Sequence, residues 1–269
     1  MTLKEAKEML SGAGIENAGF EAKLLFSHFS EYSDFELLDP ELSSASAELS
    51  DAVKRRASRE PLQYILGSVG FYREEYLVTP DCLIPRPDTE ILVDCAARNI
   101  PEGKSFLDLC TGTGCVAIST LKNTKNTTAL AVDISDGALA VAEKNARLNS
   151  VSDRITFQKA DVLSEDISGR FYALLSNPPY VTPKEYEKSE PEIFSEPKIA
   201  FIGGDDGLLF YREITERYKN KIEECGFIAF EIGYLQGDAL REIGKDNGFS
   251  VEIIKDYSNN DRVALLRKG

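Results

Sequence analysis

The fold of this 269-residue chain is best worked out from Ser176-Asn177-Pro178-Pro179-Tyr180. This stretch follows Phe171-Tyr172-Ala173-Leu174-Leu175, a short apolar run of the kind that forms a buried strand. A residue before a proline is driven out of the helical region, so Asn177 is predicted to be extended. Each proline fixes its own φ and lacks an N–H. The sequence therefore predicts a rigid segment at Asn177–Tyr180, which we call the lip. It lies at the carboxyl end of a strand, where open α/β sheets bind ligands.

This lip is suited to hold a planar nitrogen group that is conjugated to a carbonyl or to a heteroaromatic ring. Such an –NH2 group has two hydrogens to donate, and the side-chain oxygen of Asn177 and the carbonyl of Pro178 could accept both. The ring of Tyr180 could cover one face of the group. The alternative is that Asn-Pro only begins a turn, as this dipeptide often does. Four specified residues at the end of an expected strand favour the binding interpretation.

Strands and helices alternate from Lys104 onward, which predicts a parallel sheet. The expected strands are Ser105–Cys110, Ala129–Val132, Ile155–Gln158, Tyr172–Leu175, Phe227–Glu231, Ser250–Ile254 and Val263–Leu266. The expected helices between them are Cys115–Lys122, Asp136–Leu148 and Leu208–Glu223. The short link between the last two strands favours an antiparallel hairpin at the edge of the sheet.

Two other segments precede the sheet. Apolar residues recur at helical spacing from Thr2 to about Leu66, and an alternating pattern around Arg73-Glu74 indicates a β-hairpin. We therefore expect a helical domain at residues 1–66, a hairpin linker at 67–84 and an α/β domain at 85–269. Within the helical domain, the basic cluster Lys54-Arg55-Arg56…Arg59 could contact an acidic partner, but a solvated helix face is the favoured interpretation.

A further amphipathic helix is expected to run to about Asn99. It follows Ile84-Pro85-Arg86-Pro87-Asp88-Thr89-Glu90, in which the prolines set the approach and Asp88 or Thr89 can cap the helix. Arg86 and Glu90 would then lie close to the helix N-terminus. Taken by itself, this segment is an ordinary capped linker.

A glycine-rich turn joins the first strand to its helix, with the sequence Asp108-Leu109-Cys110-Thr111-Gly112-Thr113-Gly114. Gly112 and Gly114 permit a tight turn and let a ligand approach the backbone closely. Asp133 stands about 19 residues beyond Gly114, where an acid can accept hydrogen bonds from both ribose hydroxyls. Gly112-x-Gly114-x-x-Ala117 also matches the NAD fingerprint, so these features fit two classes of cofactor.

Charge separates the two cofactors. NAD requires its pyrophosphate to sit at the helix N-terminus, whereas S-adenosylmethionine has no phosphate and carries an ammonium and a sulfonium cation. Asp108 is expected at the mouth of the loop, where it would complement a cationic ligand and repel a pyrophosphate. Asp161, after the third strand, could read an adenine amino group or could simply face solvent. The set of Asp108, Gly112, Gly114 and Asp133 together favours S-adenosylmethionine.

Composition narrows the class of protein further. The formal net charge of −14 disfavours non-specific attraction to nucleic acid or to anionic membranes. The five cysteines form no CxxC pair and the chain has one histidine, so we expect free thiols in a reducing cytosol and no metal site. The chain opens on a capping-box pattern rather than a signal peptide, and no apolar run approaches the roughly 20 residues of a membrane span. A cytoplasmic protein without membrane contact is expected.

These motifs resemble those of the bacterial protein-(glutamine-N5) methyltransferases that modify peptide chain release factors. The resemblance covers nearly the whole chain, and the stretches that carry it are Pro61–Tyr64, Ile84–Glu90, Asp108–Gly114, Asn177–Tyr180, Gly204–Leu208 and Asp256–Arg262. Asn-Pro-Pro-Tyr is shared with adenine-N6 DNA methyltransferases, so Arg86–Glu90 is the more specific signal. It also argues against the sister enzyme that acts on a ribosomal protein.

The resemblance implies a seven-stranded, Rossmann-like methyltransferase domain that depends on S-adenosylmethionine, preceded by a small helical substrate-recognition domain and a β-hairpin. It implies transfer of a methyl group to the side-chain amide nitrogen of the glutamine in the Gly-Gly-Gln motif of class 1 release factors. The implied catalytic residues are Asn177, Pro178 and Tyr180, and Pro179 would complete the glutamine pocket.

The resemblance also implies a set of cofactor contacts, which are Asp108, Cys110, Thr111, Gly112, Thr113, Gly114, Asp133, Asp161, Val162 and Asn177. Asp133 would hold the ribose, and Asp161 and Val162 would border the adenine. The family often has glycine at the position of Cys110 and an aromatic residue at that of Val162, which leaves the cofactor affinity open. Arg86 and Glu90 belong to the Ile84–Glu90 motif, but the resemblance implies no specific role for them.

Three other functions fit part of the pattern. An adenine-N6 DNA methyltransferase shares the pocket chemistry but needs a basic face and usually a target-recognition region, and neither is clear in this acidic chain. A non-catalytic nucleotide-binding module would have no need of a pocket for a second planar group. A dehydrogenase is disfavoured by the charge argument. The favoured interpretation is a monomeric protein methyltransferase whose partners are class 1 release factors, with no direct binding of nucleic acid.

Overall fold

The computed structural model describes residues 1–30, 32–33 and 35–268, and the chain divides into two compact units. The smaller unit comprises Met1–Ser68 together with Glu190–Ser195, and the larger comprises Val69–Ser189 and Glu196–Gly269. The hairpin that we expected as a linker therefore belongs to the larger unit, and a segment of the expected α/β domain belongs to the helical one. Glu31, Asp34 and Gly269, which fall within the expected domain ranges, lie outside the described residues.

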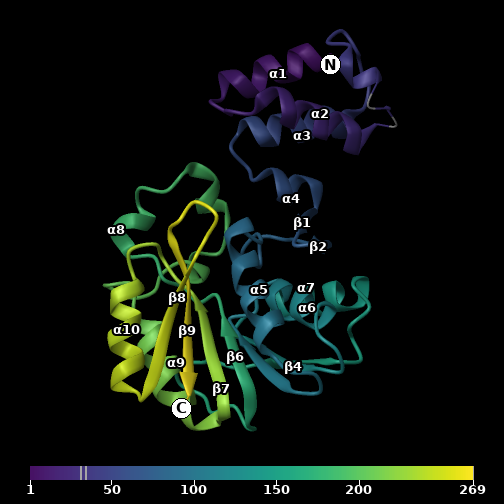
Figure 1. Cartoon of the computed structure of the whole chain (residues 1–269). Coiled ribbons are helices and arrows are strands. Elements are labelled where there is room, and N and C mark those ends of the chain that lie inside the picture. The colour runs from purple at the N-terminus through teal and green to yellow at the C-terminus, as the bar shows by residue number, and fades with distance from the viewer. Residues whose placement is uncertain (31, 34, 269) are drawn as a thin grey trace. The chain divides into compact units, whose positions relative to one another are not determined.

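The smaller unit is helical, as its periodicity predicts (Figure 1). Its helices are α1 (Leu3–Gly12), α2 (Ala18–Phe29), η1 (Glu36–Leu38), α3 (Ala47–Ala57) and α4 (Leu62–Leu66). Thr2 and Glu5 form a capping box at the start of α1. The apolar faces of α1, α2 and α3 meet in one core, which contains Leu10, Leu25 and Leu49.

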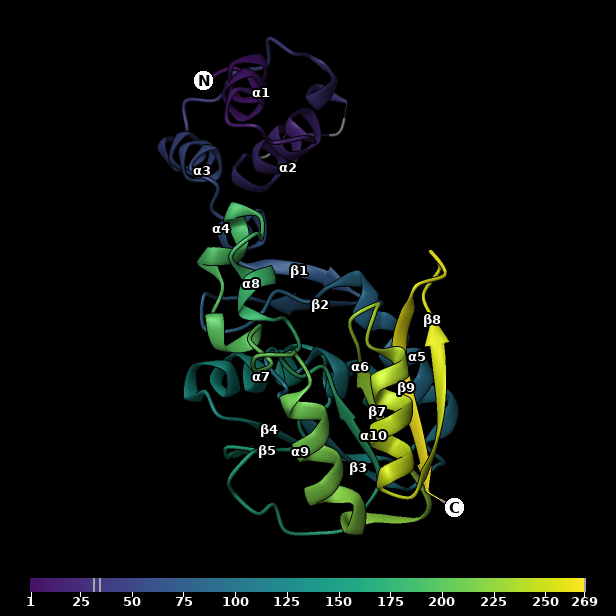
Figure 2. The same cartoon turned by 90° about the vertical axis from the view of Figure 1, so that its left-hand side faces the viewer.

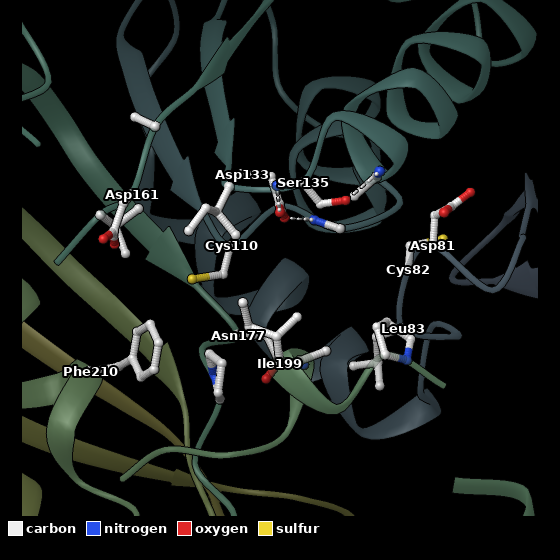
Figure 3. Close-up of a pocket in the computed structure, with 18 of the residues that line it drawn as sticks. Asp81, Cys82, Leu83, Cys110, Asp133, Ser135, Asp161, Asn177, Ile199 and Phe210 are labelled. Atoms are coloured by element: carbon white, nitrogen blue, oxygen red, sulfur yellow. Dashed lines mark hydrogen bonds between the residues drawn. The ribbon is translucent and has the colours of Figure 1, made fainter. Parts of the chain in front are cut away.

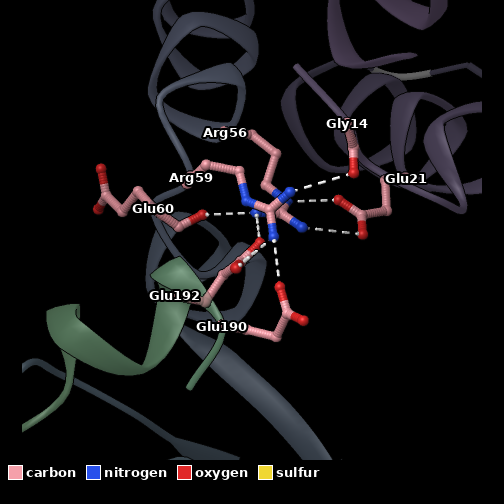
Figure 4. Close-up of polar contacts among 7 residues, drawn as sticks. All are labelled: Gly14, Glu21, Arg56, Arg59, Glu60, Glu190 and Glu192. Carbon is pink, nitrogen blue, oxygen red and sulfur yellow. Dashed lines mark hydrogen bonds and ion pairs between the residues drawn. The ribbon is translucent and has the colours of Figure 1, made fainter. Parts of the chain in front are cut away.

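The basic cluster at the end of α3 is solvated only in part, because acidic side chains from two other segments reach Arg56 and Arg59 (Figure 4). Arg56 is buried, and its Nε lies 2.5 Å from Glu21 Oε2 on α2. Its Nη1 lies 2.8 Å from Glu192 Oε1, on the short helix η3 (Pro191–Ser195). Arg59 Nη2 is 2.7 Å from the other oxygen of Glu192. A buried guanidinium requires such partners, and these ion pairs hold the 190–195 segment within the helical unit.

The larger unit is built on a seven-stranded sheet with the strand order β5-β4-β3-β6-β7-β9-β8. The strands are β3 (Ser105–Leu109), β4 (Thr128–Asp133), β5 (Ile155–Lys159), β6 (Phe171–Ser176), β7 (Ile222–Glu231), β8 (Phe249–Lys255) and β9 (Asp261–Lys268). The first five pair in parallel, whereas β9 runs antiparallel to both of its neighbours. The α/β class, the seven strands and the closing antiparallel hairpin are confirmed.

Helices cover both faces of this sheet (Figures 1 and 2). One face carries α5 (Glu90–Asn99), α6 (Cys115–Lys122) and α7 (Asp136–Leu148), and the other carries α9 (Leu209–Tyr218) and α10 (Gly237–Asp246). Four short helices lie in the connections: η2 (Pro87–Thr89), α8 (Pro183–Tyr186), η4 (Lys198–Ala200) and η5 (Lys219–Lys221). In the described part of the chain, every helix is too short or too polar to cross a bilayer.

The hairpin of β1 (Ser68–Phe71) and β2 (Glu74–Leu77) packs on this helical layer. Tyr76 is fully buried, with its hydroxyl 2.6 Å from Ser119 Oγ on α6. Asn145 on α7 accepts the Leu77 N–H at 2.7 Å. The first contact is with α6 and the second is with α7, so the hairpin is attached to both helices.

Several element boundaries differ from the predicted ones. Helix α9 ends at Tyr218 rather than Glu223, because the chain enters β7 at Ile222, and α10 was not predicted at all. Helix α5 lacks a side-chain cap, although Asp88 or Thr89 was expected to supply one. Asp88 instead pairs with Arg262, and Thr89 accepts a hydrogen bond from a different part of the chain.

Candidate active site

A cavity of about 360 Å³ opens in the larger unit, where the carboxyl ends of β3, β4, β5 and β6 come together (Figure 3). The parallel register explains the convergence, because Leu109 on β3 lies beside both Val132 on β4 and Ser176 on β6. The lining residues that follow these strands are Cys110, Gly112, Asp133, Ile134, Ser135, Ala138, Ala160, Asp161, Val162, Leu163, Asn177 and Pro179. A parallel sheet thus brings the separate sequence motifs to one place.

The glycine-rich turn after β3 adopts the left-handed backbone that its composition predicts. Gly112 has φ +55, and a Cβ added there would meet no described atom within 4 Å, so a ligand can approach this backbone. Gly114 has φ +80 and touches Ala142 of α7, which leaves little room for a side chain. Cys110 has φ 59, a conformation in which glycine would be unstrained.

Asp133 stands at the end of β4 and supports the turn. Its Oδ2 accepts the Gly112 N–H at 2.8 Å, and its Oδ1 accepts the Ser135 N–H at 3.0 Å. Burial raises the pKa of this carboxyl, and the backbone donors oppose the increase. Each carboxylate oxygen keeps a further lone pair, so Asp133 can still accept hydrogen bonds from a ligand in the cavity.

Asp161 and Val162 line the cavity after β5. Asp161 is half-buried, and its carboxylate accepts hydrogen bonds from Leu163 N–H at 2.9 Å and Ser164 Oγ at 2.7 Å. Val162 is buried and contributes an apolar surface. The structure thus places Asp161 on the cavity wall, opposite Asp81 in Figure 3, rather than on an open solvent face.

Asp108 is not at the mouth of the loop, which corrects our expectation. It is almost fully buried within β3, and Thr111 Oγ1 donates to its Oδ2 at 2.5 Å. Burial raises the pKa of this carboxyl to about 7. Thr111 and Thr113 are buried too, and neither these two nor Gly114 line the cavity. These residues support the turn from its buried side and do not contact the cavity.

The cavity is nevertheless acidic, as we expected. Three acidic residues line it, Asp81, Asp133 and Asp161, and none of the described lining residues is basic. A pyrophosphate would find no cationic side chain here, whereas a ligand that carries positive charge would be attracted. This acidic lining fits S-adenosylmethionine better than NAD.

The lip after β6 contributes Asn177 and Pro179 to the cavity wall, whereas Pro178 and Tyr180 do not line it. The Asn177 Nδ2 donates to Thr89 Oγ1 at 3.2 Å. In the described residues, no donor is bonded to Asn177 Oδ1 or to the Pro178 carbonyl. The two acceptors that the sequence singles out are therefore available.

Tyr180 is held away from the cavity. Its hydroxyl donates to Glu231 Oε1 at 3.1 Å, and its ring packs against the core that covers one sheet face. The side chain of Gln236 donates to the Tyr180 carbonyl at 3.1 Å. The interpretation that this ring covers one face of the acceptor group stays a prediction.

Arg86 and Glu90 hold two different segments. Arg86 forms an ion pair with Glu196, whose other oxygen accepts the Ile84 N–H at 2.9 Å. Glu90 accepts the Tyr72 N–H at 2.7 Å and so anchors the hairpin. Neither lies free at the helix N-terminus. Glu196 is buried, and the sequence carried no signal for it.

Sequence reasoning also missed the part of the wall that lies across from the strand ends. It consists of Asp81, Cys82 and Leu83 before the linker motif, and of Pro197, Ile199, Ala200 and Phe210 further along. Most of these residues come from irregular segments or a single short turn of helix, where periodicity gives no information, and Phe210 lies in the first turn of α9.

Comparison with known proteins places this cavity in context. Residues 2–67 match the family model of the PrmC N-terminal domain, and residues 87–198 match that of the methyltransferase small domain. A release factor glutamine methyltransferase of Thermodesulfovibrio yellowstonii is 38% identical over 86% of this chain and 85% of its own length. One of Caulobacter vibrioides is 34% identical over 97% and 93%.

The fold also recurs among solved structures. A methyltransferase from Pyrococcus furiosus superimposes with a TM-score of 0.55 at 19% identity, over 72% of this chain and 88% of that chain. At this level of identity the likeness concerns the fold alone. It supports the methyltransferase architecture that the strand order describes.

Proposed function

The chain belongs to the family of release factor glutamine methyltransferases, and we propose that it methylates the glutamine of the Gly-Gly-Gln motif in class 1 peptide chain release factors. The methyl group would come from S-adenosylmethionine and go to the side-chain amide nitrogen, N5. Our proposal adds to the family assignment the cofactor, the acceptor atom and the residues that hold them.

The observation that carries the proposal is that two kinds of binding group share one cavity. Asp133, Gly112 and the other residues after β3 to β5 offer acidic and backbone groups that suit a cationic nucleoside. Asn177, after β6, offers a carboxamide with a free oxygen. A cavity that only bound a cofactor would have no use for a second, amide-specific group beside it.

We propose that Asp133 holds the ribose hydroxyls and that Gly112 and Cys110 border the sugar and the methionine part. Asp161 and Val162 would border the adenine. The remaining residues of the turn, Asp108, Thr111, Thr113 and Gly114, act from behind by fixing its backbone. S-adenosylmethionine supplies an electrophilic methyl group on its sulfonium when it is bound.

The protein must activate a poor nucleophile, because the lone pair of an amide nitrogen is delocalised into its carbonyl. Asn177 Oδ1 and the Pro178 carbonyl would accept the two amide hydrogens and fix the plane of the group. Hydrogen bonds from the amide push electron density onto the nitrogen. Alignment by such a rigid lip can supply roughly 7–11 kcal/mol of the barrier. A methylated amide that still carries its extra proton is strongly acidic and can lose the proton to water.

The experiment that tests this proposal is transfer of labelled methyl from S-adenosylmethionine. The acceptors are an intact class 1 release factor, the same factor with the Gly-Gly-Gln glutamine changed to alanine, and duplex DNA. We expect label on the intact factor alone. Label on DNA would favour an adenine-N6 methyltransferase, and equal label on the factor without the glutamine would contradict the acceptor assignment.

Asn177→Ala tests the role of the lip in the same assay. We expect it to abolish turnover while S-adenosylmethionine still binds, because the carboxamide acts mainly on the acceptor amide. The matched control is Asn123→Ala, which removes a carboxamide from the C-terminal end of α6. Near-normal turnover in Asn177→Ala would refute the acceptor role.

We also propose that the helical unit docks the release factor, because it forms a core of its own apart from the sheet. A short Gly-Gly-Gln peptide would then be a much weaker substrate than the whole factor. Equal kcat/KM for the two would argue against a docking role. The same comparison leaves the site assignment intact, since both substrates present the same glutamine.

A further inference from the structure

Thr89 occupies a position between Asn177 and a buried carboxylate. Its Oγ1 accepts the Asn177 Nδ2 at 3.2 Å, and only 2% of the residue is exposed. Glu231, at the end of β7, is buried nearby: burial raises the pKa of its carboxyl, and the Thr89 hydroxyl opposes that increase. The threonine hydroxyl is therefore the group that holds the Asn177 carboxamide by its nitrogen.

Glu231 also holds the other end of the lip. Its Oε1 accepts the Tyr180 hydroxyl at 3.1 Å. The first residue of Asn177-Pro178-Pro179-Tyr180 is thus held by Thr89, and the last is held by Glu231. Burial raises the pKa of Glu231, and the nearby Arg262 opposes that increase. Arg262 in turn pairs with Asp88 and Asp256.

The direction of these hydrogen bonds determines which atom Asn177 presents to the cavity. A carboxamide carries its donors on Nδ2 and its acceptor on Oδ1. Because Thr89 Oγ1 accepts from Nδ2, the Asn177 Oδ1 is left for the substrate. If the Asn177 carboxamide were turned the other way, its N–H groups would face the cavity and repel the –NH2 group of a glutamine.

We propose that Thr89 and Glu231 are positioning residues for the methyl transfer. Thr89 fixes the Asn177 carboxamide with its oxygen toward the acceptor amide, and Glu231 holds the Tyr180 end of the lip. This inference rests on the proposed function, because it gives the carboxamide a task only if an amide nitrogen is the acceptor. It assigns a purpose to the threonine of the Arg86–Glu90 motif, which caps no helix.

The test compares variants that separate volume from hydrogen bonding. Thr89→Val keeps the volume and removes the hydroxyl, Thr89→Ser keeps the hydroxyl, and Glu231→Gln replaces the carboxylate that accepts from Tyr180 with a neutral amide. The matched control is Thr120→Val on α6, a fully buried threonine whose hydroxyl has no bonded partner among the described residues. For each variant, kcat and KM are measured with the release factor, and the Kd for S-adenosylmethionine is measured by calorimetry.

We expect Thr89→Val and Glu231→Gln to lower kcat by roughly tenfold to hundredfold, the scale of a misplaced catalytic group. The Kd for S-adenosylmethionine should stay within about twofold, and Thr89→Ser should restore most of kcat. Unchanged kcat in Thr89→Val would overturn the inference. Equal losses in Thr89→Val and Thr89→Ser, or in Thr120→Val, would also overturn it, because packing would then be the cause.

A readout without catalysis separates this inference from the proposed function. The side-chain amide signals of Asn177, identified in nitrogen-15 spectra by their loss in Asn177→Ala, should move in Thr89→Val and keep their wild-type position in Thr89→Ser. If the wild-type protein does not methylate the release factor but these signals behave as expected, the proposed function fails and the orientation of Asn177 stands. Signals that do not respond to Thr89→Val would refute the orientation itself.

Discussion

Gly203→Ala is the perturbation that most directly tests whether the position of the lip controls catalysis. Gly203 lies against the lip, with its N–H donating to the Val181 carbonyl at 3.0 Å. A Cβ at this position would stand 2.5 Å from the Pro179 carbonyl oxygen and 2.7 Å from the Tyr180 Cα. Both are backbone atoms, so no side chain can rotate to make room.

The size of the effect follows from these distances. Ordinary contact of a Cβ begins near 3.4 Å, so the two backbones must separate by about 0.9 Å (3.4 minus 2.5). A displacement of about 1 Å at a catalytic group can cost roughly a hundredfold in rate. We therefore expect kcat to fall by about two orders of magnitude. Overpacking of this kind also costs about 1–3 kcal/mol of stability, which leaves most of the protein folded.

The assay is methyl transfer to the release factor, with S-adenosylmethionine binding measured in parallel. Gly70→Ala is the matched control, because a Cβ on Gly70 would meet no described atom within 4 Å. We expect the control to keep wild-type kcat and both variants to bind S-adenosylmethionine. If Gly203→Ala retained kcat within about twofold while folded, the rigidity of the lip would not matter, and the positioning argument would be refuted.

Three further predictions concern charge. Asp108→Asn should remove part of the pH dependence of the protein's stability. The folded carboxyl keeps its proton up to about pH 7, whereas the unfolded chain releases it near the ordinary pKa, so the stability of the wild type falls as pH rises between these two values. The urea midpoints measured at pH 5 and pH 8 should therefore differ less in the variant than in the wild type. Asp133→Ala should weaken S-adenosylmethionine binding at least tenfold by calorimetry, and an unchanged Kd would exclude the ribose contact. Glu192→Ala should destabilise the protein by about 2 kcal/mol in urea unfolding, because buried Arg56 loses one of its two carboxylate partners. The control Glu143→Ala, which breaks an exposed ion pair with Arg147, should cost less than about 0.5 kcal/mol. Equal effects of the two substitutions would show that burial of the ion pair is unimportant.

The parts of the fold that the sequence predicted are those with strong periodicity. Helices α6 and α7 begin and end at the predicted residues, because each combines a clear apolar face with a polar boundary. The order of strands and helices was enough to predict a parallel sheet, and the sheet then explains why Cys110, Asp133, Asp161 and Asn177 meet. Residues after neighbouring parallel strands must share one edge.

Two of the misses, helix α10 and the first half of strand β7, share a physical cause, which is glycine that serves packing rather than a turn. Helix α10 contains Gly244, whose Cβ would be 2.2 Å from Val251 on β8, so the glycine lets helix and strand approach closely. Strand β7 contains Gly226, whose Cβ would be 2.3 Å from the Tyr172 carbonyl, beside Cys225 with φ 61. Both glycines interrupt the local pattern, and only tertiary contacts show that the helix and the strand continue through them.

The candidate site shows a different limit. Sequence could identify residues that face the cavity, such as Asn177, but not the residues that fix their orientation, because those contacts join distant segments. The segment Arg86–Glu90 demonstrates this. Its arginine pairs with Glu196, just before residues of the cavity wall, and its threonine accepts from the carboxamide of the lip. Its glutamate holds the hairpin. One short segment thus sets three elements, and a substitution within it should disturb the site through whichever element it releases.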